Sequence, residues 1–115
     1  MEIKKQNEIE EKVVDMEGAK NVRMQILTKG AGNFIMRRFI VGKDGYTPLH
    51  KHEWEHEAFI LKGKGIVVDE GKEIEVEQGT VIYVEPNKEH QFINKSEEPF
   101  EFICVIPSQD KSCPR

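Results

Sequence analysis

The stretch GYTPLHKHEWEHEAFILKG, residues 45–63, contains three of the four histidines of this 115-residue chain. These three are His50, His52 and His56, and the fourth, His90, stands before a short apolar run. Neutral imidazole is the commonest side-chain ligand of first-row divalent metals. Histidines scattered over a surface would not be concentrated in this way. The sequence therefore predicts one metal site built from all four histidines.

The spacing of the first three histidines favours a strand. Side chains on an extended strand alternate between its two faces, so His50 and His52 point to the same side. His56 has the same parity but lies beyond Trp54 and Glu55, where we expect a bend. The alternative is a metal-free polar cluster on the surface, because acidic residues are interspersed with the histidines.

Two motifs resemble those of the cupin family. The first reads Gly45-YTPL-His50-Lys-His52-EWE-His56-EAFILK-Gly63, where cupins have a glycine, HxH, an acidic ligand and a second glycine. The second reads Gly79-TVIYVE-Pro86-NKE-His90-QFI-Asn94, where cupins have a glycine, a proline, a histidine and an asparagine. The resemblance covers about residues 42–106. It implies an all-β fold, the cupin double-stranded β-helix or jelly-roll barrel.

One position departs from the usual cupin pattern. Counting six residues back from Gly63 places His56 where most cupins have a glutamate ligand. The longer spacing from His52 would select Glu57 instead, but strand parity favours His56. The chain thus resembles small single-domain cupins with an all-histidine, manganese-type site. This resemblance implies one divalent ion per chain, with Mn expected first and Fe, Ni, Cu, Zn or Co as alternatives.

Two further residues are candidates for the metal cavity. By the same resemblance Arg37 faces that cavity, where a guanidinium could bind an anionic substrate. The alternative is a surface arginine paired with a glutamate. Cys104 shares the parity of Phe102 and Ile106 and faces either the cavity or the packed core.

Short runs rich in Val, Ile and Phe, separated by turn residues, predict an all-β sandwich or barrel. Strands are expected at residues 24–27, 34–41, 58–61, 65–68, 73–76, 80–84, 91–94 and 100–106. Turns are expected at residues 30–32, 42–45, 63–65, 70–71 and 86–87. The charged segment Asn7 to Lys12 predicts a helical turn or a flexible arm.

A chain of this length can bury one core, so we expect a single domain. Its expected parts are an N-terminal arm with one or more strands over residues 1–33, a barrel over 34–108 and a flexible tail over 109–115. Cys113 in that tail is expected to be a surface thiol, and the absence of CxxC argues against a zinc ribbon.

Charge and hydropathy limit the partners of the chain. A net charge of −4 argues against a nucleic-acid surface, which needs a basic stripe. No apolar run reaches membrane-spanning length, and the N-terminal sequence lacks the apolar core of a signal peptide. We therefore expect a cytoplasmic protein that binds a small molecule. A two-fold homodimer is also expected, because the strand-like segment from Val22 to Leu27 could pair with a second subunit.

Two classes of function fit this sequence. The first is a metal-dependent enzyme, a dioxygenase or other oxidative enzyme acting on a small, partly apolar organic molecule. The second is a non-catalytic module that binds or senses a small molecule, and a sugar-type isomerase is a weaker third. A site without a carboxylate ligand is also expected to lose metal as the pH falls through ~6.5.

Overall fold

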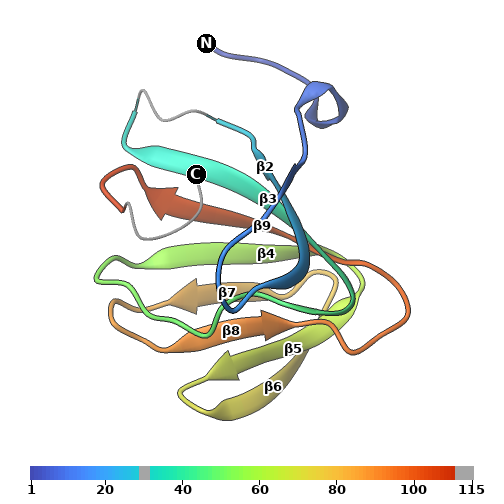
Figure 1. Ribbon diagram of the computed structural model, residues 1–115. Coiled ribbons are helices and arrows are strands. Elements are labelled where there is room, and N and C mark those ends of the chain that lie inside the picture. Colours follow the sequence, from blue (N-terminus) through green and yellow to red (C-terminus); the bar gives the residue numbers. More distant parts are fainter. Residues whose placement is uncertain (29–31, 111–115) are drawn as a thin grey trace.

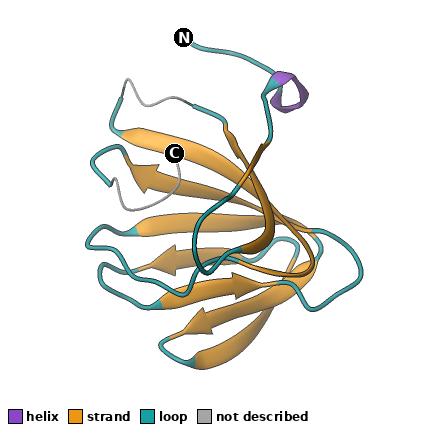
Figure 2. Ribbon diagram, in the orientation of Figure 1, coloured by secondary structure: helices purple, strands orange, loops and turns teal. Residues whose placement is uncertain are grey.

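The computed structural model describes residues 1–28 and 32–110 of the chain. Strands dominate these residues, and a short 3-10 helix, η1 (Gln6–Glu8), lies near the N-terminus (Figure 2). The strands are β1 (Lys12–Val13), β2 (Lys20–Ile26), β3 (Phe34–Tyr46), β4 (His56–Lys62), β5 (Lys64–Asp69), β6 (Lys72–Glu77), β7 (Val81–Val84), β8 (His90–Ile93) and β9 (Phe100–Pro107). The all-β prediction is confirmed, and each of the eight expected strands has a counterpart.

The strands form one curled antiparallel sheet that resembles a half-barrel (Figure 1). Their order is β6-β5-β8-β3-β9-β4-β7, with β2 on the other side of β3 and β1 beyond β2. Strand β3 pairs with β2 and β9 along its first part, and its last residue, Tyr46, pairs with Ile93 of β8. Because β3 spans both halves of the sheet, it brings the two histidine motifs to the same barrel.

The turn predicted at residues 42–45 is wrong, because β3 runs through it to Tyr46. The strand bends there instead of ending: Asp44 has a φ of 60°, and the β2–β3 register shifts between Lys20 and Val22. Gly45 permits the close approach, since a Cβ at this position would lie 2.7 Å from the carbonyl oxygen of Lys20. The turns predicted at 63–65, 70–71 and 86–87 are confirmed by the chain reversals there. Most of the turn predicted at 30–32 lies outside the described residues.

The N-terminal segment folds onto its own chain. Strand β2 pairs with β3 of the same molecule, for example Met24 with Phe39, so the strand we expected at a subunit contact is used internally. The buried Gln25 side chain donates from Nε2 to the carbonyl oxygens of Gln6 (2.9 Å) and Ile9 (2.7 Å). These bonds hold the helical turn, which was one of the two forms expected for this segment.

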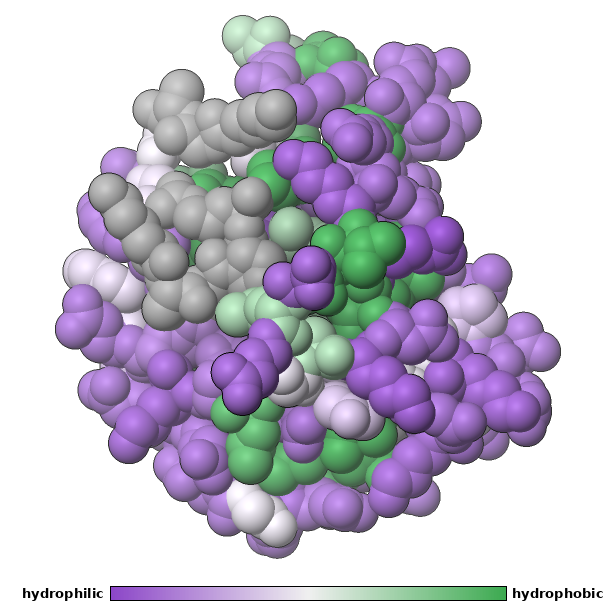
Figure 3. Space-filling view, in the orientation of Figure 1, coloured by the Kyte–Doolittle hydropathy of each residue, from purple (hydrophilic) through white to green (hydrophobic). Residues whose placement is uncertain are grey.

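Alternating side chains of the strands fill the barrel. Along β9 every second residue is buried, beginning with Phe100. The inward rings stack in a row: Phe39 and Phe102 have centroids 5.2 Å apart, and Phe92 and Phe102 have centroids 4.2 Å apart. Outside this core the face in Figure 3 is largely hydrophilic, with hydrophobic side chains gathered at its centre and lower part. The aromatic row forms one wall of the interior next to the histidines.

We predict that Gly63→Ala destabilises the fold by about 2–4 kcal/mol, because a Cβ would both force a left-handed residue and strike the carbonyl oxygen of Pro99. Gly71→Ala is the matched control: its φ is +83° but no atom lies within 4 Å of the added Cβ. The control should lose only about 1 kcal/mol. Urea unfolding of the three proteins measures the difference, and equal losses in both variants would contradict this account.

Candidate metal centre

The four histidines reach the barrel interior from different elements. His56 begins β4, His90 begins β8, and His50 and His52 lie in the segment between β3 and β4. His50 and His90 exchange backbone hydrogen bonds of 3.1 and 3.0 Å. Because this bridge joins the two sequence motifs directly, their imidazoles lie side by side.

The four rings form one cluster. Centroid distances are 4.4 Å for His50–His52, 4.4 Å for His52–His56, 4.7 Å for His56–His90 and 5.0 Å for His50–His90. One ring nitrogen each of His50, His52 and His90 lies within 4.8 Å of the others, a spacing at which three ligands can share an ion. His56 packs against two members of this group without joining it. The structure thus brings three predicted ligands within metal-binding reach and places the fourth at their side.

Backbone acceptors set the tautomers of two histidines. Nδ1 of His50 lies 2.6 Å from the carbonyl oxygen of Pro48, and Nδ1 of His90 lies 2.7 Å from that of Lys88. A carbonyl oxygen only accepts, so Nδ1 carries the proton in both rings. Their Nε2 atoms then keep a lone pair, which is the arrangement of metal-binding histidines.

The Nδ1 atoms of the other two histidines lie next to side chains. Nδ1 of His52 lies 3.4 Å from a carboxylate oxygen of Asp110, and both side chains are buried. Nδ1 of His56 lies 3.6 Å from Sγ of Cys104. Nε2 of His56 is buried and has no hydrogen-bond partner among residues 1–28 and 32–110. Leaving such an atom unsatisfied is costly, and a metal ion would satisfy it, so the donor set fits a divalent cation.

Glu57 does not compete for this site. It is exposed on β4 and lies opposite Tyr83 of β7, while its neighbours His56 and Ala58 are buried. The inward His56 and outward Glu57 agree with the strand parity that favoured His56 in the sequence.

Burial keeps these imidazoles neutral. It lowers the pKa of His56 to about 3 and that of His90 to about 4, and nearby histidines act in the same direction. Burial also lowers the pKa of His52, although the Asp110 carboxylate opposes this effect. Metal binding requires unprotonated imidazole, so the three rings are in their binding form at neutral pH.

A small cavity of about 30 Å³ adjoins the cluster and is lined by Arg37 and Cys104 together with His50, His56 and His90. Arg37 is only 1% exposed, which excludes the surface position left open by the sequence. Its Nη2 donates to Sγ of Cys104 at 3.1 Å, and its guanidinium carbon lies 4.9 Å from the ring centroid of Phe39. Cys104 is buried and contacts both Arg37 and His56, so it faces the cavity. Burial raises the pKa of its thiol, while the Arg37 charge opposes that shift.

Sequence reasoning missed Asp110. The residue falls in the predicted tail over 109–115, yet it is 1% exposed and touches His52. The domain therefore extends at least to residue 110, while Cys113 lies outside the described residues. A lone aspartate in a polar segment carries no signal that distinguishes it from solvated neighbours.

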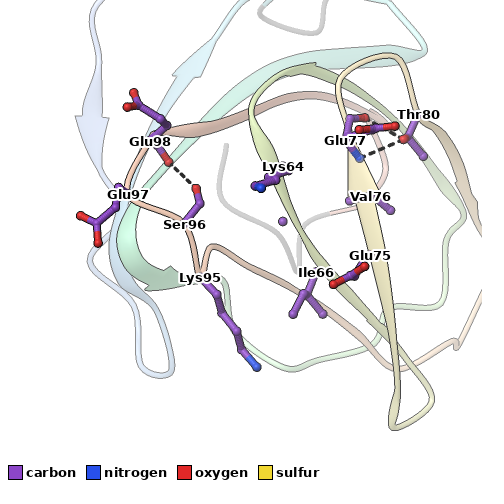
Figure 4. A pocket seen from close by; sticks show the side chains of 11 residues that line it. Lys64, Ile66, Glu75, Val76, Glu77, Thr80, Lys95, Ser96, Glu97 and Glu98 are labelled. Atoms are coloured by element: carbon purple, nitrogen blue, oxygen red, sulfur yellow. Dashed lines mark hydrogen bonds between the residues drawn. The ribbon is translucent and has the colours of Figure 1, made fainter.

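A larger hollow of about 870 Å³ lies away from the histidines, between the β5–β6 hairpin and the turn after β8. Figure 4 shows side chains of both charges around it, including Lys64, Lys95 and Glu75. The two hydroxyl side chains that line this hollow donate hydrogen bonds within their own turns. Thr80 donates to the carbonyl oxygen of Glu77 (2.7 Å), and Ser96 donates to that of Glu98 (3.0 Å). This open surface has none of the imidazole ligands, so the metal chemistry belongs to the barrel interior.

Comparison with known proteins agrees with this geometry. Residues 37–106 match the cupin domain family (cupin 2). The chain belongs to the cupin family. A solved structure of the polyketide cyclase RemF from Streptomyces resistomycificus superposes with a TM-score of 0.89 and 30% identity, covering 95% of this chain and 80% of that one. The predicted resemblance to small cupins is confirmed at the level of family and fold.

Curated relatives are matched over shorter stretches. An oxalate-binding protein from Thermotoga maritima is 37% identical over 59 residues, covering 50% of this chain and 49% of that protein. A glucose-6-phosphate isomerase from Pyrococcus furiosus is 36% identical over 92 residues, covering 70% and 49%. This chain spans about half the length of these curated relatives. None of the described helices is both long and apolar enough to cross a membrane.

We predict that the metal-free fold loses stability as the pH falls from ~6.5 toward ~4. In this window the unfolded histidines bind protons that folded His56 and His90 exclude, since their pKa values are about 3 and 4. Stability therefore falls with pH below ~6.5, and these two groups add no pH dependence above neutrality. Urea unfolding between pH 4.5 and 8 measures the profile, and His56→Gln should flatten it. An unchanged midpoint across the range would contradict buried neutral histidines.

The same shifts revise the expectation for metal affinity. Protons compete with the ion at His56 and His90 only near pH 4 and below, because both rings are already neutral at higher pH. Protonation of these two histidines should thus weaken metal binding at a lower pH than the ~6.5 expected from ordinary histidines.

Proposed function

We propose that His50, His52, His56 and His90 together bind one divalent ion, and that the chain is a Mn/Fe-type metalloenzyme of the dioxygenase class. Its substrate is a small, partly apolar organic molecule. The observation that carries this proposal is the arrangement of the ring nitrogens. Protein groups engage the Nδ1 side of each ring, and three of the histidines bring nitrogens within 4.8 Å of one another.

The ligand set favours an open site. Four neutral imidazoles would leave the +2 charge of the ion uncompensated, and a six-coordinate Mn or Fe ion would have two further positions for other ligands. When bound, such an ion supplies Lewis-acid and one-electron redox chemistry. Four histidines would instead complete the shell of a four-coordinate zinc ion, which makes zinc the less suitable metal for catalysis.

The surrounding residues suit an apolar substrate with an oxygen-bearing end. Phe92 and Phe102 give the small cavity apolar walls, while Arg37 provides a buried positive charge toward an anionic group. A second hollow of about 280 Å³ reaches His90 from between β6 and β7. Its walls combine Val67, Val76 and Val84 with charged side chains, namely Asp69, Glu85 and Lys88. An organic molecule would therefore approach the histidines between apolar and charged groups. Arg37 and Cys104 remain proposed cavity residues in this scheme.

Two relatives support other functions. Similarity to an oxalate-binding protein supports the alternative of a binding or sensing cupin without turnover. Matches to glucose-6-phosphate isomerases support the sugar-type isomerase. A cytoplasmic setting stays a prediction.

We predict that wild-type protein binds close to one Mn²⁺ or Fe²⁺ per chain and that His52→Ala or His90→Ala loses most of it. Each variant removes one ligand nitrogen, so metal affinity should fall by about 100-fold or more. This loss is larger than the one expected when a residue that only supports a ligand is removed. His56→Gln should also lower affinity, whereas Glu57→Gln on the outer face is the control and should keep the metal. Elemental analysis and titration of the metal-free proteins measure both quantities.

Retention of near-stoichiometric metal in both alanine variants would contradict the site. Loss of metal in Glu57→Gln with retention in His56→Gln would overturn the choice of fourth ligand. Oxygen uptake by the metal-loaded protein against catechols, β-diketones and alkenyl phenols then separates the functions. Tight binding of such molecules without oxygen consumption would favour the binding module.

We also propose that two copies associate through the outer face of β4 and β7. Phe59 lies opposite Val81 across these strands, and Tyr83 follows on β7, with exposed fractions of 45%, 75% and 53%. Strand β7 ends the sheet order, so one of its edges is open to pairing. A two-fold contact would cover both the edge and the apolar side chains of each copy.

We predict a dimer of about twice 13.3 kDa by light scattering at micromolar concentration. Val81→Lys should shift the protein to monomer, because a charge would be buried in the contact. Val13→Lys, at an equally exposed valine on β1, is the control and should leave the mass unchanged. A monomeric wild type would refute the proposal.

A further inference from the structure

Asp110 is buried at the end of the described chain, beside a predicted metal ligand. Its side chain is 1% exposed, and a carboxylate oxygen lies 3.4 Å from Nδ1 of His52. A backbone hydrogen bond of 3.1 Å from Asp110 to Pro107 places the carboxylate directly after β9. Burying a carboxylate is expensive unless it gains a specific partner, so its position calls for a function.

His52 is the histidine with the least support from the sheet. His56 and His90 belong to strands, and His50 is bridged to His90 by two backbone hydrogen bonds. His52 belongs to none of the described strands, and its carbonyl accepts one bond from the Asn87 amide. The orientation of its ring therefore depends more on side-chain contacts than that of the other three.

We propose that Asp110 is the positioning residue that holds His52 ready for metal, a role that rests on the proposed metal site. A carboxylate oxygen 3.4 Å from Nδ1 of His52 would accept the Nδ1 proton, which would fix the tautomer whose Nε2 keeps its lone pair. Backbone carbonyls do the same for His50 and His90, at Pro48 and Lys88. Asp110 adds a negative charge that a carbonyl lacks, and this charge favours a cation bound by neutral ligands.

This role differs from direct ligation. The Asp110 carboxylate lies 3.4 Å from Nδ1 of His52. It contacts His52 on the Nδ1 side, the side opposite the nitrogen left for the ion. Asp110 thus makes the segment after β9 part of the metal site without touching the metal.

The test begins with metal-free protein. Long-range ¹H–¹⁵N spectra should show His52 with a protonated Nδ1 in the wild type and a mixture of tautomers in Asp110→Ala. His50 and His90 should be the same in both, because backbone carbonyls hold them. An unchanged His52 tautomer in Asp110→Ala would overturn the proposal, even if the wild type binds no metal.

Metal titration gives the second readout. Asp110→Ala should weaken Mn²⁺ binding by about 10–100-fold, and Asp110→Asn, which keeps the size but loses the charge, by about 10-fold. The exposed Asp44→Asn is the control and should bind like wild type. In a His52→Ala background, Asp110→Asn should cause no further loss, whereas in His50→Ala it should still cause one. Affinity within about twofold of wild type in both Asp110 variants would refute the positioning role and leave the histidine site standing.

If Asp110→Ala does not fold, the decision falls to Asp110→Asn. Its side chain has the same shape, and unfolding curves of the metal-free protein will show whether the fold is retained. A folded Asn variant with weaker binding supports the proposal, and one with wild-type affinity overturns it.

Discussion

Two backbone hydrogen bonds between His50 and His90 join the parts of the chain on which the site depends. The two residues are far apart in sequence, and the bridge is formed only when β3, β8 and the segment before β4 meet. Strand β3 makes this meeting possible, because it bends past Gly45 from the β9 side of the sheet to the β8 side. Once the bridge is in place, the imidazoles converge as a consequence of strand parity.

Bringing four imidazoles together inside the barrel has an energetic cost, because polar rings are removed from water. Buried imidazoles must stay neutral, and burial lowers the pKa of His56 and of His90 accordingly. In the metal-free barrel the desolvation of these polar rings is therefore only partly compensated, and a bound cation would offset the remaining cost. Backbone carbonyls, a carboxylate and a thiol engage the Nδ1 side of the cluster, so the rings are oriented before any ligand arrives. Such preorganisation reduces the ordering that binding requires.

The alternation of apolar and polar residues along each strand explains what could be predicted from the sequence. Alternation located the strands and placed His56 inward and Glu57 outward, because a half-buried strand exposes every second residue. The prediction failed at residues 42–45, because glycines usually mark the end of a strand but here lie at a bend inside β3. Asp110 could not be found in this way, since its burial arises from a tertiary contact with His52 and not from any local pattern. Local pattern could not place Arg37 either, and only the resemblance to cupins put it at the cavity. Its position between Phe39 and Cys104 is set by the pairing of β3 with β9.

The most direct test of the central claim is X-ray absorption spectroscopy at the metal edge of Mn²⁺-loaded protein in solution. The account predicts a first shell of nitrogen and oxygen atoms, with the multiple-scattering pattern of four imidazoles and no sulfur neighbour. His52→Ala should remove one imidazole from that pattern or remove the metal. A first shell with fewer than three imidazoles, or one dominated by carboxylate or sulfur, would contradict the claim that the histidine cluster is the metal centre.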